Sequence, residues 1–144
     1  MTPAERTDLG TWITPAQLAL FSSMHVADQR HGIDVAATMR SAGVDSGEAL
    51  LAGLLHDAGK GRTGVWPRVA YALGDHYGQW IWRIAAIMPG FASDLERLRT
   101  HAEASAEMAL LAGCPARTVD LIRHQERPRD PEFGEALRRA DEAN

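Results

Sequence analysis

The chain has 144 residues, of which 45% are hydrophobic and 24% charged, and its formal net charge is −4. This length suits one domain with a sizeable core, and the composition is ordinary for a soluble globular protein. The acidic balance argues against a surface that binds duplex nucleic acid, although a local basic cluster can still bind a small phosphorylated ligand. The single cysteine, Cys114, excludes an internal disulfide and a cysteine-based zinc site.

The first ten residues include Pro, Glu, Arg and Asp and contain no apolar run, so they do not resemble a signal peptide. No stretch approaches the roughly 18–20 apolar residues that a membrane span needs. A lone cysteine also fits a reducing compartment. We therefore expect a cytoplasmic protein without membrane partners, whose residues 1–13 are loosely ordered and whose residues 14–144 form one domain. Composition leaves the oligomeric state open.

Residues that favour helix starts and helix ends recur along the chain, and no run alternates apolar and polar residues as a strand does. This pattern predicts an all-α fold. Thr14 and Pro15 form a cap followed by proline at the first helical position, so a short helix is expected from residue 15 to 21. A second helix is expected over 27–41, with its stop at Gly43.

A third helix is expected to start near Ser46 and to end at Gly59, before a loop over 60–67. Glycine or proline separates most of the helical patterns that follow. These patterns cover residues 68–73, 79–88, 92–99, 101–112, 115–125 and the chain from 132 onwards. The sequence therefore predicts a bundle of short helices.

His56 and Asp57 are the most informative pair, because they follow the apolar run 49–55 and precede Gly59 and Lys60. Two metal-ligand side chains at the end of a core helix indicate a site on a rigid scaffold. Four further candidates lie on other expected helices, namely His31, His101, His124 and Asp141. Each lies on or beside an apolar helical face, so a bundle can bring all six together.

A buried aspartate is costly unless it is paired or coordinated, and Asp57 and Asp141 both face this cost. We expect no Lys or Arg in the core faces to pair with them, so a divalent cation is the natural partner. Histidine and carboxylate without thiolate suit Fe, Mn, Zn, Co or Ni. Taken singly, His31 or His124 fits a hydrogen-bonded core histidine better than a ligand, and only the ordered set favours a ligand role.

The order of these residues resembles the HD superfamily of metal-dependent phosphohydrolases, and the resemblance extends from about residue 14 to 144. Four local segments carry it: Asp-Gln-Arg-His-Gly at 28–32, Leu-Leu-His-Asp-Ala-Gly-Lys at 54–60, Thr-His-Ala-Glu at 100–103 and Ala-Asp-Glu-Ala at 140–143. The second segment is close to the motif that gives the family its name. The resemblance implies an α-helical bundle around a metal site.

The resemblance also implies ligands for one or two divalent ions, which can be Fe, Mn, Mg, Zn, Co or Ni. The first metal would be bound by four residues: His31, His56, Asp57 and Asp141. The second would be bound by His101 and His124, with Asp57 bridging. Gln125 departs from the pattern, because several members of the family with two metals have a second histidine there. The chain also ends soon after Asp141, which leaves little protein to shape a pocket on that side.

By the same resemblance, Asp57 would act in catalysis as the bridging ligand of a metal-activated water. Lys60 would contact a phosphate, although a solvated loop lysine is the alternative. The expected reaction is hydrolysis of a phosphomonoester or phosphodiester on a small, nucleotide-like molecule. Two alternatives remain open: a di-iron oxygenase with the same ligand order, and a non-catalytic, metal-stabilised module that binds a nucleotide.

Overall fold

The computed structural model describes residues 2–60 and 94–144, and the side chains of 94–100 are not among the described features. The helices predicted over 68–73 and 79–88 lie outside these residues. Within them the chain is helical and contains no strand, as the sequence predicts. In chain order the elements are α1 (Pro3–Leu9), α2 (Pro15–Ser23), α3 (Val26–Ser41), α4 (Gly47–Leu55), the 3₁₀ helix η1 (Ala58–Lys60), α7 (Asp94–Leu111), α8 (Ala116–Arg123) and α9 (Gly134–Glu142).

The local start and stop signals act as the sequence predicts. The Thr14 hydroxyl accepts a hydrogen bond from the backbone of Gln17, whose side chain accepts one from the backbone of Thr14, so α2 begins with a capping box. Ser46 caps α4 in the simpler way, through its hydroxyl. Gly43 follows α3 with a φ of 91°, a conformation that favours glycine.

Three boundaries differ from the prediction. Helix α4 ends at Leu55 rather than at Gly59, and the chain tightens into a turn and then η1. Residues 94–111 form one continuous helix, α7, where we expect two helices that meet at Thr100; nothing in that segment forces a break. Helix α9 begins at Gly134, because Asp130 accepts hydrogen bonds from the backbone of Glu132 and Phe133 and holds this stretch in a turn. The expected loosely ordered segment 1–13 contains helix α1.

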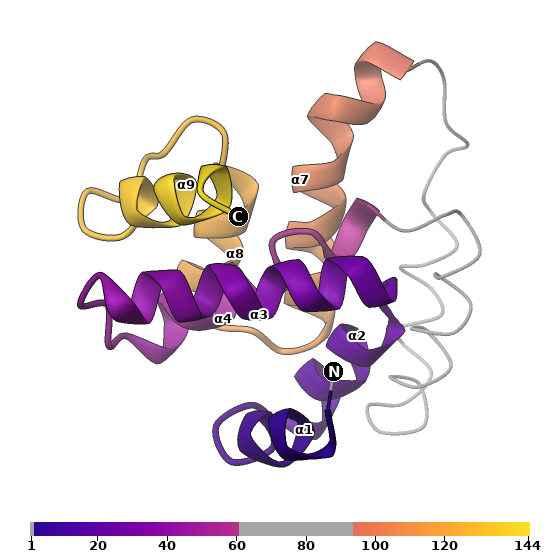
Figure 1. Ribbon diagram of the computed structural model, residues 1–144. Coiled ribbons are helices and arrows are strands. Elements are labelled where there is room, and N and C mark those ends of the chain that lie inside the picture. The colour runs from indigo at the N-terminus through magenta and orange to yellow at the C-terminus, as the bar shows by residue number, and fades with distance from the viewer. Residues whose placement is uncertain (1, 61–93) are drawn as a thin grey trace.

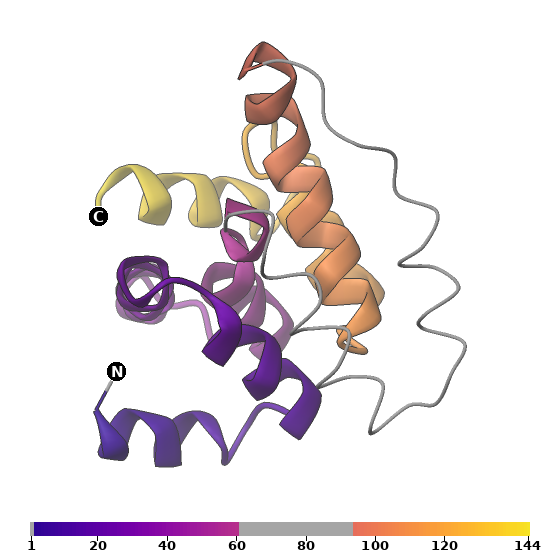
Figure 2. The ribbon, with the colours of Figure 1, turned by 90° about the vertical axis from the view of Figure 1, so that its right-hand side faces the viewer.

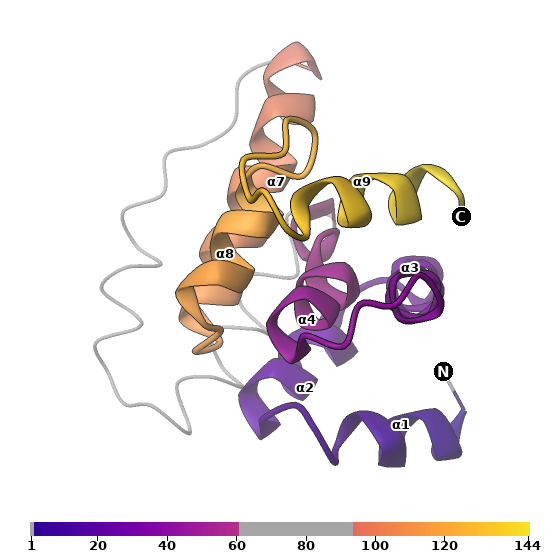
Figure 3. The same cartoon turned by 90° about the vertical axis from the view of Figure 1, so that its left-hand side faces the viewer.

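The helices enclose one apolar core. Helix α3 packs against α4, α9 lies against both, and α8 joins α4 to α7. Figure 1 shows α3 in front of α4, with α9 above them and α1 and α2 below. Figure 2 shows α7 running past η1, and Figure 3 shows α8 alongside α7. The largest fully buried apolar side chains come from six helices and include Phe21, Met39, Leu54, Leu55, Met108, Ile122 and Leu137.

Two glycines allow α3 and α4 to lie unusually close together. A Cβ atom at Gly32 would lie 2.5 Å from the carbonyl oxygen of Leu54, and one at Gly53 would lie 2.9 Å from the sulfur of Met39. Any larger residue at Gly32 would push the helices apart, because the obstacle is backbone. This close packing brings His31, the residue before Gly32, beside His56, and their ring centroids lie 5.1 Å apart.

Candidate metal centre

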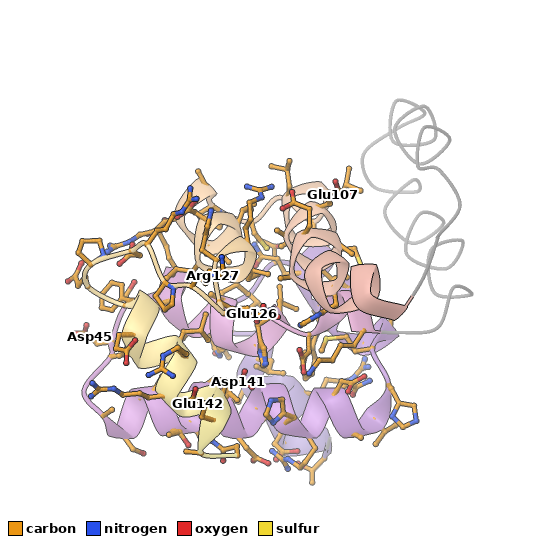
Figure 4. The ribbon with its side chains drawn as sticks, turned by 90° about the horizontal axis from the view of Figure 1, so that it is seen from above. Asp45, Glu107, Glu126, Arg127, Asp141 and Glu142 are labelled. Carbon is orange, nitrogen blue, oxygen red and sulfur yellow. The ribbon has the colours of Figure 1, made fainter. Side chains whose placement is uncertain are left out.

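Three side chains from distant parts of the sequence meet at one point. Nε2 of His31 lies 2.8 Å from Oδ1 of Asp141, and Nε2 of His56 lies 3.2 Å from the same oxygen. One potential ligand atom from each of these residues lies within 4.8 Å of the other two. Figure 4 shows Asp141 on α9, where this helix passes over α3. The group therefore depends on the packing of α9 against α3 and on the turn that follows α4.

The ring of His56 is oriented by the helix that precedes it. Its Nδ1 lies 2.8 Å from the carbonyl oxygen of Gly53. A carbonyl only accepts, so Nδ1 carries the proton and Nε2 faces Asp141. A backbone acceptor on the far ring nitrogen is the usual support of a metal-bound histidine. In its neutral form His56 thus presents a lone pair to the centre of the group.

Asp57 forms the buried floor beside this group, with a side chain only 2% exposed. Its Oδ2 lies 2.8 Å from Nζ of Lys60, and its Oδ1 lies 3.5 Å from Nε2 of His56. This Oδ1 is buried and has no hydrogen-bond partner among the described residues. Nε2 of His31 lies 3.9 Å from Oδ2 of the same carboxylate. An unpartnered buried carboxylate oxygen is costly, so a carboxylate with an imidazole near each oxygen fits a divalent cation.

The pairing of Lys60 with Asp57 corrects the expectation that no Lys or Arg neutralises the buried aspartates. The tight turn over residues 57–60 folds the lysine back, and its backbone N–H also donates to the Asp57 carbonyl oxygen at 2.9 Å. The sequence predicts that the helix ends at Gly59 and that Lys60 begins a loop, whereas η1 extends through Lys60. The ammonium group therefore approaches the buried carboxylate from the solvent side.

The charges within the group shift two pKa values. Burial lowers the pKa of His56, but its hydrogen bond to the Asp141 carboxylate and the charge of Asp57 raise the pKa more, and the net shift is upward. The hydrogen bond from His56 holds the pKa of Asp141 well below its ordinary value, against the opposing effect of burial. Without a metal, these groups therefore favour an imidazolium–carboxylate pair.

The structure does not bring the two remaining candidates into this group. His124 directs Nδ1 to the carbonyl oxygen of Asp120 at 3.0 Å. Nε2 of His101 lies 3.4 Å from the side-chain nitrogen of Gln125, which lies at the same distance from the carbonyl oxygen of His56. The buried Gln125 therefore lies between the backbone of His56 and the ring of His101.

Ser105 is a supporting residue that the sequence reasoning misses. It is fully buried on α7, and its hydroxyl accepts a hydrogen bond from the backbone of Gly59 at 2.8 Å. A Cβ at Gly59 would lie 2.7 Å from the His101 carbonyl oxygen, so η1 lies directly against α7. The helical period places Ser105 on the same face as His101, which is the signal that identifies it. Together Ser105 and Gly59 fix the turn that carries Lys60.

The group has a buried floor and an exposed rim. His56 and Asp57 are almost completely buried, whereas the side chains of Asp141 and Lys60 are 39% and 45% exposed. His31 is intermediate. A ligand can thus approach from the side of Asp141 and Lys60. A separate hollow of about 340 Å³ between α3 and α9 is lined mainly by apolar atoms and by none of these residues.

In the part of the chain that the structure describes, no helix has the length and apolar character needed to cross a membrane.

Fold and site together describe an all-helical protein with a histidine and aspartate group that can hold a divalent cation. A family model for the HD domain matches residues 29–143, and the chain therefore belongs to the HD domain family. This confirms the resemblance found in the sequence and the all-α, single-domain fold. The family implies membership of a superfamily of metal-dependent hydrolases. Comparisons with curated proteins and with solved structures gave no significant match.

Proposed function

We propose that the chain is a metal-dependent phosphohydrolase that acts on a phosphomonoester or phosphodiester of a small, nucleotide-like molecule. The observation that carries the proposal is the convergence of His31, His56 and Asp141 beside Asp57, whose buried Oδ1 has no hydrogen-bond partner among the described residues. Membership of the HD family supports the reaction class. The nucleotide-like substrate follows from the resemblance alone.

His31, His56 and Asp141 would bind the metal, with Asp57 as the adjoining carboxylate. A divalent cation at such a site supplies a water of lowered pKa and offsets negative charge on phosphoryl oxygens. The Gly53 carbonyl holds the His56 ring with Nε2 facing inward, so no reorientation is needed on binding. We propose one ion at this group, because His101 and His124 are not among the described residues that converge there.

The substrate would approach over the exposed rim. Lys60 places a partly exposed cation beside Asp57, and an ammonium group is a common phosphate contact. The acidic chain as a whole disfavours extended nucleic-acid duplexes, so the proposed partner is a small phosphorylated molecule.

The test is phosphate or nitrophenol release from nitrophenyl phosphate, bis-nitrophenyl phosphate and a set of nucleotides, with Mn²⁺, Mg²⁺, Zn²⁺, Co²⁺, Ni²⁺ or Fe²⁺. We expect metal-dependent turnover that falls at least about 100-fold in Asp57→Asn, with a much smaller change in melting temperature. Glu142→Gln is the matched control, since this exposed carboxylate on α9 pairs with Arg138 outside the site.

Three outcomes contradict the proposal. Absence of turnover with every metal and ester would remove the hydrolase function. Oxygen consumption with Fe²⁺ in place of ester hydrolysis would favour the oxygenase reading of the same ligand set. Turnover that falls only in proportion to melting temperature in Asp57→Asn would assign the site a structural role.

A further inference from the structure

Lys60 is the only lysine in the sequence, although Lys and Arg together number 15. Lys60 forms an ion pair with Asp57, the most deeply buried carboxylate of the site, and its ammonium nitrogen lies 2.8 Å from Oδ2 of Asp57. The other Lys or Arg ion pairs in the described part of the chain are made by arginine, for example Arg30 with Glu5 and Arg117 with Asp130. The one ion pair made by lysine is therefore the one at the candidate metal centre.

The two oxygens of Asp57 face different surroundings. Oδ2 receives the ammonium from the rim, while Oδ1 faces Nε2 of His56 and lacks a hydrogen-bond partner among the described residues. Asp57 is 2% exposed, so its charge needs a counter-ion in every state of the protein. Lys60 supplies that charge from a side chain that is 45% exposed.

A divalent cation at this carboxylate would repel the ammonium. Two positive charges a few ångströms apart repel each other, and a partly buried site screens this repulsion less than bulk water does. The lysine side chain is a flexible stem with a compact charge, and its exposure lets it turn toward solvent. The rest of the turn need not move, because Gly59 is held by Ser105 on α7.

We propose that Lys60 is an exchangeable counter-ion of Asp57. It neutralises the buried carboxylate while no divalent cation is bound, and it leaves Asp57 when a cation takes that position. Its ammonium group is then available at the rim for a phosphoryl group. This last step rests on the proposed phosphohydrolase function, whereas the exchange itself requires only metal binding. Arginine suits this role less well, because its planar fork binds a carboxylate through two hydrogen bonds.

The single lysine makes the exchange directly observable. In protein labelled with ¹⁵N-lysine, the side-chain ammonium gives one NMR signal, which reports whether Nζ is hydrogen-bonded or exchanging with water. We expect a hydrogen-bonded signal in metal-free protein that shifts, or is lost to solvent exchange, as Zn²⁺ or Mg²⁺ is added. The change should follow the binding isotherm measured by calorimetry on the same sample. Inorganic phosphate added to the metal-loaded protein should shift the signal again.

Variants test the same exchange thermodynamically. Lys60→Met removes the competing charge, so the metal should bind about tenfold or more tightly, while the metal-free protein should melt at a lower temperature. Lys60→Arg keeps the charge and should not tighten metal binding. Arg6→Met makes the same charge change on α1, where the exposed Arg6 contacts Ser22, and should leave metal affinity unchanged.

The outcomes separate this inference from the proposed function. An ammonium signal that stays unchanged while calorimetry records metal binding overturns the exchange, as does equal metal affinity in Lys60→Met and Arg6→Met. Failure to bind any divalent cation overturns both the exchange and the proposed function. Exchange at Asp57 without hydrolysis of any ester upholds the exchange and rejects the phosphohydrolase.

Discussion

The Asp141 carboxylate lies 2.8 Å from Nε2 of His31, although 110 residues separate the two. This contact joins the last helix to α3, and His56 completes the group from the turn after α4. Oδ1 of Asp141 therefore lies within hydrogen-bond distance of both histidines. Its position makes the C-terminal helix part of the site rather than a cover over it (Figure 4).

Replacing Asp141 by asparagine should remove most metal binding. The amide keeps the shape of the side chain but loses the charge that both histidines face. We expect metal affinity to fall by more than the roughly 10–100-fold that the loss of an outer-shell partner costs. Isothermal titration with Zn²⁺ or Mn²⁺ measures the change. Glu142→Gln, at the next position, should bind metal as the wild type does, and equal losses in the two variants would assign Asp141 no specific role.

Metal-free stability should depend on pH through the His56–Asp141 pair. The pKa of His56 is raised above its ordinary 6.5, so its contribution is full below that value and is lost as pH rises through the raised pKa. The pKa of Asp141 is lowered below its ordinary 3.8, so its contribution is full above that value and is lost as pH falls through the lowered pKa. The pair should therefore stabilise the metal-free protein most between these two ordinary values.

Above neutral pH, metal affinity should rise with pH, whereas the stability of the metal-free protein should fall. A metal takes the neutral imidazole, so each protonated histidine must first release its proton, and affinity should rise with pH as His56 deprotonates. Melting temperatures from pH 5 to 9, with and without Zn²⁺, give both trends. In Asp141→Asn the slope of the metal-free curve should flatten. The quantity to compare is the difference in melting temperature between the metal-free wild type and Asp141→Asn. If this difference is the same at pH 6 and at pH 8.5, the assigned ion pair is contradicted.

Gly59→Ala should destabilise the protein and disturb the site together. The added Cβ would lie 2.7 Å from two backbone atoms, the His101 oxygen and the Ser105 nitrogen, and neither can move without shifting α7. We expect a loss of about 1–3 kcal/mol in the free energy of unfolding, measured by urea denaturation. Gly47→Ala is the matched control, because a Cβ there meets nothing within 4 Å and should be neutral or slightly stabilising. Similar effects at both glycines would contradict the packing of η1 against α7.

Local signals in the sequence predict the start of α2, the end of α3 and the start of α4. The Thr14–Gln17 capping box, the Ser46 cap and the left-handed Gly43 all satisfy backbone groups within a few residues, so their effect does not depend on the rest of the fold. The end of α4 is different. His56 still has helical backbone angles, and the tightening into η1 reflects the contact of Gly59 with α7, which local sequence does not encode.

The site is predictable in outline and not in its contacts. The order of histidines and aspartates identifies the family, and the structure brings His31, His56 and Asp141 together with Asp57 beside them. The sequence predicts a helix end at Gly59 and places Lys60 in a loop, whereas η1 extends through Lys60 and holds it three residues after Asp57, where the ion pair forms. The placement of Gln125 between His56 and His101 depends on how α8 packs against α4 and α7. Which of the six candidate ligands lie together therefore depends on the packing of the helices and cannot be read from their order in the sequence.

Metal content tests the central claim most directly. Protein purified without chelator, and protein saturated with Mn²⁺ or Zn²⁺ and then desalted, should each be measured by elemental analysis alongside His31→Ala and His124→Ala. We predict one ion per chain in the wild type and in His124→Ala, and almost none in His31→Ala. Wild-type protein that retains no metal, or His31→Ala protein that retains as much as wild type, would contradict a divalent cation bound by His31, His56 and Asp141.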